Sequence, residues 1–314
     1  MKLGIDMGGM SIKMGLVNEE NEIIGRITIP TDLTVPYQVL VERMADAVQQ
    51  MLENAGMTLE QCEGIGIGSP GTIDAKQGVI LYSNNFGWEN VPIVEELKKH
   101  LDTRIEIAND ADAAALGEVC AGAAEGAENA VLLTLGTGVG GGVILDKKIF
   151  RGAMPGGCEL GHLSIRYDGI RCTCGRKGCL EAYASASALL RIAREKSAEH
   201  PESIMNEMCG NDLEQMNGKI PFDATKAGDE AGMEVVKEYE GYLACGIANV
   251  INTFRPEKVI LGGGVAAQRE NLTAPLKGLV KDMCFGGSHG YIADIVTSVL
   301  GNDAGIIGAA NLVV

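Results

Sequence analysis

Along the chain, short apolar runs typical of strands alternate with segments whose apolar residues recur every three or four positions, as in helices. Short apolar runs bounded by glycine or polar turns predict strands, at 2–6, 11–17, 22–29, within 64–71, 105–109, 258–265 and 292–298. Apolar positions three and four residues apart predict helices, at 37–56, 92–101, 110–119, 185–198, 229–254 and 303–312. A strand, a Gly-rich turn and a second strand open the chain and recur at 130–152, which hints at internal duplication.

Length and composition narrow the classes of protein that this chain can represent. The 314 residues, with 46% hydrophobic and 22% charged positions, predict a folded protein of two domains. A net charge of −16 argues against nucleic acid and against an anionic membrane surface as partners. No apolar run has the length of a membrane span, and the nine cysteines form no disulfide framework. We therefore expect a cytoplasmic protein.

Three Gly-rich turns, Gly8-Gly9, Gly136 to Gly142 and Gly262 to Gly264, are candidate phosphate sites, because residues without a Cβ let successive amides approach an anion. The second turn contains a GxGxxG match, but strand-like residues follow it where a dinucleotide fold requires a helix. Each turn taken singly fits an ordinary hairpin equally well. Asp6, at the end of the first strand, is a candidate carboxylate for Mg²⁺ on ATP phosphates, and Lys13 is either a phosphate contact or a surface lysine.

Asn109 and Asp110 lie at the junction between the predicted strand 105–109 and the predicted helix 110–119. Both residue types are common helix caps, which is the structural alternative. A carboxylate at such a junction can also accept the proton of a substrate hydroxyl during phosphoryl transfer. Asp112 is the rival, but its place in the first helical turn suits a dipole role. We favour Asp110 as the base.

One histidine and three cysteines lie close together in the chain, at His162, Cys172, Cys174 and Cys179. An imidazole and three thiolates complete a tetrahedral zinc site with no open position, which is the pattern of structural zinc. The alternative is that some of these cysteines are simply buried. Three cysteines within eight residues, separated by two glycines, favour zinc.

Seven segments taken together resemble the ROK family of sugar kinases, in the same order: DMGGMSIKMGL, GSPGTID, NDADAAALGE, LGTGVGGG, GCELGHLSI, CTCGRKGCLEAYAS and LGGGV. The resemblance implies an α/β protein with the actin-like, Hsp70-like ATPase fold, two RNase H-like domains and a cleft between them for sugar and ATP. We place the smaller domain at 1–118 plus 301–314, and the larger domain, with the zinc loop, at 119–300.

The family pattern also implies roles for individual residues. Asp110 resembles the catalytic base, and the sugar-binding positions are Gly71, Asn85, Asn109, Glu159, His162 and Glu181, with Asn84 as an alternative to Asn85. His162 would contact the sugar with one ring nitrogen and zinc with the other. Phosphate positions are Gly8, Gly9, Thr137 and Gly138, and the adenosine-side turn is Gly263-Gly264. Met10 replaces the threonine usual in the family, and Ser11 is the candidate to compensate for the lost hydroxyl.

The expected function is an ATP-dependent hexose kinase of carbohydrate metabolism and glycolysis, acting on the 6-hydroxyl of glucose with Mg²⁺ and structural zinc. N-acetylmannosamine, N-acetylglucosamine, fructose and allose remain alternative substrates. A sugar-responsive repressor of the same family is the rival from another class, but its N-terminal helix-turn-helix is not expected here, because the chain opens on the first phosphate strand. A catalytically weak sugar sensor is the other alternative, motivated by Met10. The family also implies a homodimer.

Overall fold

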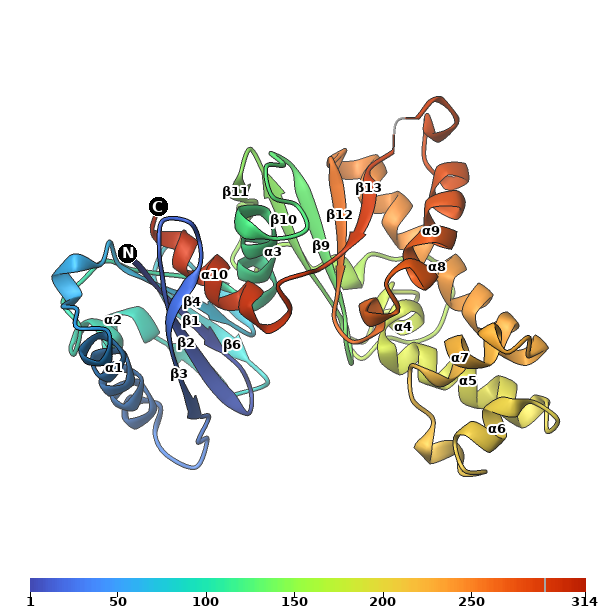
Figure 1. The fold of residues 1–314 in the computed structure, drawn as a ribbon, viewed down its shortest axis with the longest axis horizontal. Coiled ribbons are helices and arrows are strands. Elements are labelled where there is room, and N and C mark those ends of the chain that lie inside the picture. Colours follow the sequence, from blue (N-terminus) through green and yellow to red (C-terminus); the bar gives the residue numbers. More distant parts are fainter. Residues whose placement is uncertain (291) are drawn as a thin grey trace. The chain divides into compact units, whose positions relative to one another are not determined.

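The structure, a computed structural model, describes residues 1–290 and 292–314 (Figure 1). It divides into two compact units, which we treat separately. The first unit comprises Met1–Leu132, Gly142–Cys158 and Val299–Val314, and the second comprises Leu133–Gly141 and Glu159–Ser298. The domain limit expected at 118 falls inside a helix, Asp110–Ala121, so the first unit continues past it.

A five-stranded sheet of order β3-β2-β1-β4-β8 forms the centre of the first unit. Its three neighbouring strands β1, β2 and β3 are antiparallel, and β4 and β8 continue the sheet in parallel with β1. The strands span Lys2–Met7, Ser11–Val17, Ile23–Pro30, Ile65–Ser69 and Ile105–Asn109. Residues of β1 and β4 are almost all buried, as expected for strands covered on both faces.

Two helices, α1 (Tyr37–Asn54) and α2 (Ile93–Lys98), cover one face of this sheet. The apolar stripe of α1 predicted this contact, because its buried side chains recur at helical spacing, from Leu40 through Met44 and Val48 to Met51. They pack with strand residues into one core.

The other face of the sheet is lined with glycine and packs against α10 (Ala304–Ala310), which also packs against α3 (Asp110–Ala121). A Cβ at Gly66 would overlap the carbonyl oxygen of Ala309, and one at Gly308 would overlap that of Ala113. The alternating glycines of IGIGS therefore let a helix backbone lie directly on the sheet.

Gly66→Ala is expected to lower the free energy of unfolding by about 3 kcal/mol, because α10 must shift to admit the new methyl group. Gly25→Ala on β3 is the control. The new Cβ would lie 3.4 Å from its nearest neighbour, which is an ordinary contact, so no element has to move. Urea unfolding of the two variants measures the difference. Equal stabilities would show that the α10 contact is not tight.

A three-stranded sheet of order β5-β6-β7 also belongs to the first unit and was not predicted. Its strands, Thr72–Asp74, Val79–Ser83 and Trp88–Val91, are three to five residues long. They show no sustained apolar alternation, and Tyr82 is half exposed. Short strands held by hairpin pairing leave little signal in the sequence.

The second five-stranded sheet has the order β11-β10-β9-β12-β13, which repeats the arrangement of the first. Its strands are Ala130–Leu135, Val139–Leu145, Lys148–Ile149, Lys258–Gly262 and Asp294–Thr297. The repeated opening noticed in the sequence therefore corresponds to the two β-turn-β starts of equivalent sheets. Beyond β11 come helices, among them α4 (Glu181–Ala184), α5 (Ala186–Glu199), α6 (Ile204–Met208), α7 (Ile220–Lys226), α8 (Glu230–Phe254) and α9 (Glu270–Met283).

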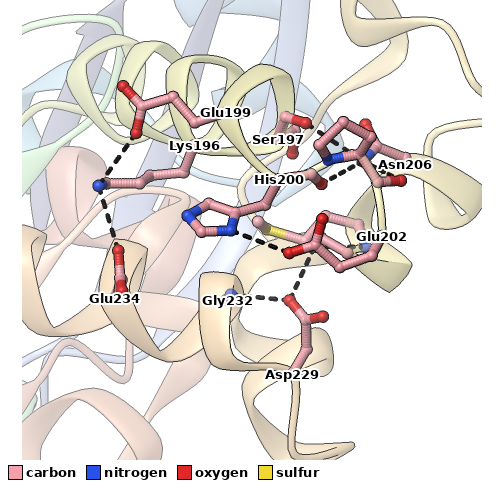
Figure 2. A network of polar contacts seen from close by, with 12 residues as sticks. Lys196, Ser197, Glu199, His200, Glu202, Asn206, Asp229, Gly232 and Glu234 are labelled. Atoms are coloured by element: carbon pink, nitrogen blue, oxygen red, sulfur yellow. Dashed lines mark hydrogen bonds and ion pairs between the residues drawn. The ribbon is translucent and has the colours of Figure 1, made fainter.

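A network of polar contacts joins the end of α5 and the start of α6 to the start of α8 (Figure 2). Asp229, the N-cap of α8, accepts hydrogen bonds from the Gly232 amide and the Ser203 hydroxyl, both at 2.8 Å. Lys196 lies between Glu199 and Glu234, at 3.2 and 3.1 Å. The cap supports the long helix on which part of the second unit is built. Within residues 1–290 and 292–314, every helix is too short or too polar to cross a bilayer.

Candidate active site

Asp6 lies at the end of β1 in the first unit and faces two charged neighbours. Lys13 Nζ is 3.9 Å from Asp6 Oδ2. Lys13 is the residue on β2 that lies opposite Asp6 in the antiparallel β1–β2 pair. Burial raises the pKa of Asp6 above its ordinary value, Lys13 opposes this, and the Asp110 carboxylate adds to it. The interaction indicates that Asp6 and Asp110 share one electrostatic environment. Gly305 admits the carboxylate, since a Cβ there would lie 2.8 Å from Asp6 Cγ.

The first Gly-rich turn is held by hydrogen bonds from both sides. The Gly8 amide donates to Ser11 O at 3.0 Å, and the Thr31 hydroxyl donates to Gly8 O at 2.6 Å. Met10 points outward and is 90% exposed, so the missing family hydroxyl leaves the turn itself intact. Ser11 begins β2 and pairs with Pro30.

The structure brings together three of the predicted residues at the junction of β8 and α3. Asn109 caps α3 by accepting from the Ala111 amide at 2.9 Å, and its Nδ2 donates to Gly71 O at 3.1 Å. Asp110, the first residue of α3, also accepts from the Ala111 amide at 2.9 Å. Burial raises the pKa of Asp110, and hydrogen bonds from Ala111, its own amide and Asn109 oppose the rise. Because burial outweighs these hydrogen bonds, the carboxylate has a greater capacity to accept a proton than an exposed aspartate.

Asn85 lies on the exposed turn between β6 and β7, in the same unit as Asn109. Its alternative, Asn84, accepts a weak hydrogen bond from Tyr82 Oη at 3.4 Å. The geometry of the first unit thus favours neither asparagine as a ligand.

A cavity of about 290 Å³ in the first unit contains Asn109 in its wall. It contains several charged side chains that sequence reasoning did not assign to the site, namely Asp74, Lys76, Asp112 and Arg151. Asp112 was considered only as a rival base. Asp74 ends the GSPGTID segment but was given no role, and Lys76 and Arg151 belong to no motif. Only folding brings segments 74–76 and 151–157 next to β8.

In the second unit, Glu181 lies directly against the Gly-rich turn between β9 and β10. Its Oε2 accepts from the Val139 amide at 3.1 Å, and a Cβ at Gly138 would overlap that same oxygen. The turn is held from its other side, where the Ala186 amide donates to Gly136 O and the Ser187 hydroxyl to Thr137 O, at 2.8 and 2.9 Å. The predicted sugar ligand and the predicted phosphate turn are therefore in contact.

The histidine and three cysteines form a compact cluster, in which the four ligand atoms lie within 4.8 Å of one another. Cys174 Sγ and Cys179 Sγ are 3.7 Å apart, and Cys172 Sγ is 3.7 Å from His162 Nδ1. Tetrahedral ligands at a zinc–sulfur distance of about 2.3 Å are separated by about 3.8 Å, so the donors fit zinc. Burial and the neighbouring sulfurs raise the pKa of the Cys179 thiol to about 12. A bound cation would favour the thiolate form of this side chain.

The cluster is linked to the remaining predicted sugar ligands. His162 directs Nδ1 to the sulfurs, which leaves Nε2 available, and its amide donates to Glu159 O at 3.0 Å. Gly161 fixes this segment on β10, because a Cβ there would overlap the carbonyl oxygen of Val139. Glu181 Oε1 accepts from Cys172 Sγ at 3.4 Å and from Thr173 Oγ1 at 3.1 Å. Thr173 is a contact that sequence reasoning missed.

Gly264 of the third Gly-rich turn opens onto a pocket of about 480 Å³ in the second unit, with Val265, Gln268 and Asn271 among its lining residues. Gly263 has φ +82°, and a Cβ there would lie 2.5 Å from Leu135 O. This close backbone approach requires glycine. The adenosine-side role of this turn stays a prediction.

The predicted residues thus form one set in each unit. Those of the first unit are Asp6, Gly8, Gly9, Ser11, Lys13, Gly71, Asn85, Asn109 and Asp110. Those of the second unit are Thr137, Gly138, Glu159, His162, Cys172, Cys174, Cys179, Glu181, Gly263 and Gly264.

Comparison with known proteins gives consistent matches over almost the entire chain. The family model described as "ROK family" matches residues 2–314. A glucokinase from Thermotoga maritima is 36% identical over 312 residues, which cover 99% of this chain and 96% of that protein. A xylose repressor from Bacillus subtilis is 29% identical and is matched over 76% of its own length by 99% of this chain.

Solved structures agree with these sequence matches. A ROK family glucokinase from Streptomyces griseus, in complex with glucose and AMPPNP, superposes with a TM-score of 0.79 at 32% identity, covering 99% of this chain and 98% of that one. A ROK hexokinase from Thermus thermophilus superposes with a TM-score of 0.80 at 32% identity, covering 99% of this chain and 97% of that one. The predicted actin-like ATPase fold is confirmed, and the chain belongs to the ROK family.

Proposed function

We propose that this protein is an ATP-dependent glucokinase that phosphorylates the 6-hydroxyl of glucose. Glucokinases match the chain from end to end, and the S. griseus relative binds glucose and AMPPNP. The observation that carries the proposal is the buried Asp110 carboxylate at the start of α3, beside an asparagine fixed to Gly71.

Asp110 accepts the proton of the attacking hydroxyl, while Asn109, Glu159, His162 and Glu181 hold the other sugar hydroxyls. The amides of the Gly8-Gly9 and Thr137-Gly138 turns bind the phosphates. Asp6, at the end of β1, is the carboxylate best suited to hold Mg²⁺, which when bound neutralises charge on the phosphates. His162, Cys172, Cys174 and Cys179 would hold zinc, which when bound would keep the histidine and Glu181 in fixed positions.

A sugar panel tests the proposal. ATP turnover is measured with glucose, N-acetylmannosamine, N-acetylglucosamine, fructose and allose, and glucose is expected to give the highest kcat/KM. A better substrate among the others would change the assigned sugar. Sugar binding without turnover would favour a sensor, the second candidate, which the match to xylose repressors and the exposed Met10 support.

The acid limb of the pH–rate profile is expected to lie above the ordinary aspartate pKa. Burial raises the pKa of Asp110, so the base is protonated, and inactive, up to a higher pH than an exposed aspartate would be. The profile of kcat/KM for glucose measures this, with circular dichroism at each pH as the control for folding. A limb at the ordinary aspartate value would contradict the buried-base assignment.

We also propose the pathway, the cellular location and the oligomeric state of the enzyme. A kinase of free glucose acts at the entry to glycolysis, which fits the cytoplasm. We propose a homodimer as well, and sedimentation analysis tests it.

A further inference from the structure

Thr31 is a half-buried threonine that contacts the first Gly-rich turn and has no role in the proposed chemistry. It directly follows Pro30, the last residue of β3. Its hydroxyl donates to Gly8 O at 2.6 Å, and its amide donates to Met10 O at 3.0 Å. One residue outside the turn therefore holds two of the carbonyl groups of the turn.

The turn differs from an ordinary hairpin at its closing pair. Gly8 and Ser11 are the next pair of residues beyond Met7 and Ile12 in the β1–β2 register. A hydrogen-bonded antiparallel pair normally exchanges two N–H···O bonds. In the part of the chain that the structure describes, this pair forms only one, from the Gly8 amide to Ser11 O at 3.0 Å. Gly8 O, which would accept the second bond, accepts from Thr31 instead.

The bonds to Thr31 set the directions of the amides in the turn. In a trans peptide, a C=O group and the N–H group of the next residue point in opposite directions. Because Gly8 O and Met10 O are directed at Thr31, the Gly9 and Ser11 amides are directed away from it. Among residues 1–290 and 292–314, the amides of Gly9 and Met10 have no backbone partner. A Cβ at Gly9 would meet no atom within 4 Å, so the space beside this residue is open.

We propose that Thr31 is a positioning residue for phosphate binding. By holding Gly8 O, it keeps the hairpin from closing and leaves the successive amides of Gly9, Met10 and Ser11 available to phosphate oxygens of ATP. Successive backbone N–H groups of this kind bind anions. The inference rests on the proposed use of ATP, and it does not require Thr31 itself to contact the nucleotide.

The same arrangement explains how the turn accommodates Met10. The Met10 side chain is 90% exposed, and the residue is held through its carbonyl group alone. The hydroxyl that acts on the turn therefore comes from the end of β3 rather than from the turn itself.

Thr31→Val tests the inference, because valine keeps the branched shape of threonine and removes the hydroxyl. Gly8 O then becomes available to the Ser11 amide, which is lost to the phosphates. Calorimetric titration of the full chain in the presence of Mg²⁺ should show ATP binding about tenfold weaker than in wild type, since a bond from an amide to a charged oxygen is lost. Adenosine, which has no phosphate, and glucose should each bind within about twofold of wild type.

Two further variants separate the hydroxyl from other effects of substitution. Thr31→Ser keeps the hydroxyl, so its affinity for ATP should lie within about threefold of wild type. Thr34→Val is the matched control, because the Thr34 hydroxyl donates to Asp32 Oδ1, at 2.6 Å, rather than to the turn. This control should bind ATP like wild type. Circular dichroism of each variant checks the fold.

The inference is overturned if Thr31→Val binds ATP like wild type, or if it loses affinity for adenosine and ATP equally. An equal loss of ATP binding in Thr31→Ser or in Thr34→Val would also overturn it, because the effect would not then belong to the Thr31 hydroxyl. Unfolding of Thr31→Val would assign the residue to stability instead. In each of these cases wild type still binds and uses ATP. A wild-type protein that does not bind ATP would overturn the proposed kinase function as well, which distinguishes the two failures.

Discussion

Asp110→Asn is expected to lower kcat for glucose phosphorylation about a thousandfold, while the Kd for glucose changes less than about threefold. Asparagine keeps the size of the side chain and can still accept from the Ala111 amide, which lies 2.9 Å from Asp110 Oδ1. Its amide has no basic oxygen for the hydroxyl proton. The loss should therefore appear in the chemical step, as measured by steady-state kinetics alongside calorimetric glucose binding.

Asp112→Asn is the matched control for this prediction. Asp112 is buried in the first turn of α3 and contacts Gly157, so its substitution should affect stability more than kcat. Thermal unfolding of both variants separates the two effects. Wild-type turnover in Asp110→Asn would contradict the assignment of Asp110 as the base. A larger kcat loss in Asp112→Asn would transfer that role to Asp112.

The cluster of one histidine and three cysteines could be predicted from sequence because its members are close together in the chain. Cys172, Cys174 and Cys179 lie within eight residues, and two glycines between them allow the tight turns. The contact between Asn109 and Gly71 joins residues 38 apart. The family motifs implied that both bind sugar, but not that they contact each other. Sites whose residues are close together in the chain could be predicted from the sequence pattern. Contacts between distant residues depend on the order of the strands, which the pattern does not give.

Other features of the fold and the site could not be predicted from the sequence pattern. Gly4 of β1 and Gly66 of β4 lie directly against the backbone of α10, and no motif indicated this close packing. The contact between Glu181 and Gly138 joins a predicted sugar ligand to a predicted phosphate turn, and no motif indicated that the two are neighbours. Glu240 reads as one more polar position of an amphipathic helix, and only the packing of α7, α8 and α9 shows that it is buried.

Cys174→Ser is expected to lose zinc and to weaken glucose binding by about ten- to a hundredfold. Cys174 is exposed, so the substitution itself disturbs little packing. Without the metal, His162 loses the partner of its Nδ1, and the segment that carries Thr173, whose hydroxyl donates to Glu181 Oε1, loses its anchor. Metal analysis and calorimetry with glucose measure the two effects.

ATP binding should change less than about threefold in the same variant, because the phosphate turn has supports outside the cluster. Ala186 and Ser187 hold Gly136 and Thr137 from α5, whichever position Glu181 takes. Cys245→Ser, in the same unit but outside the cluster, is the control and should keep zinc and both affinities. Full zinc content in Cys174→Ser would refute the ligand assignment. Equal losses of glucose and ATP binding would instead mean that zinc supports the whole unit rather than the sugar ligands.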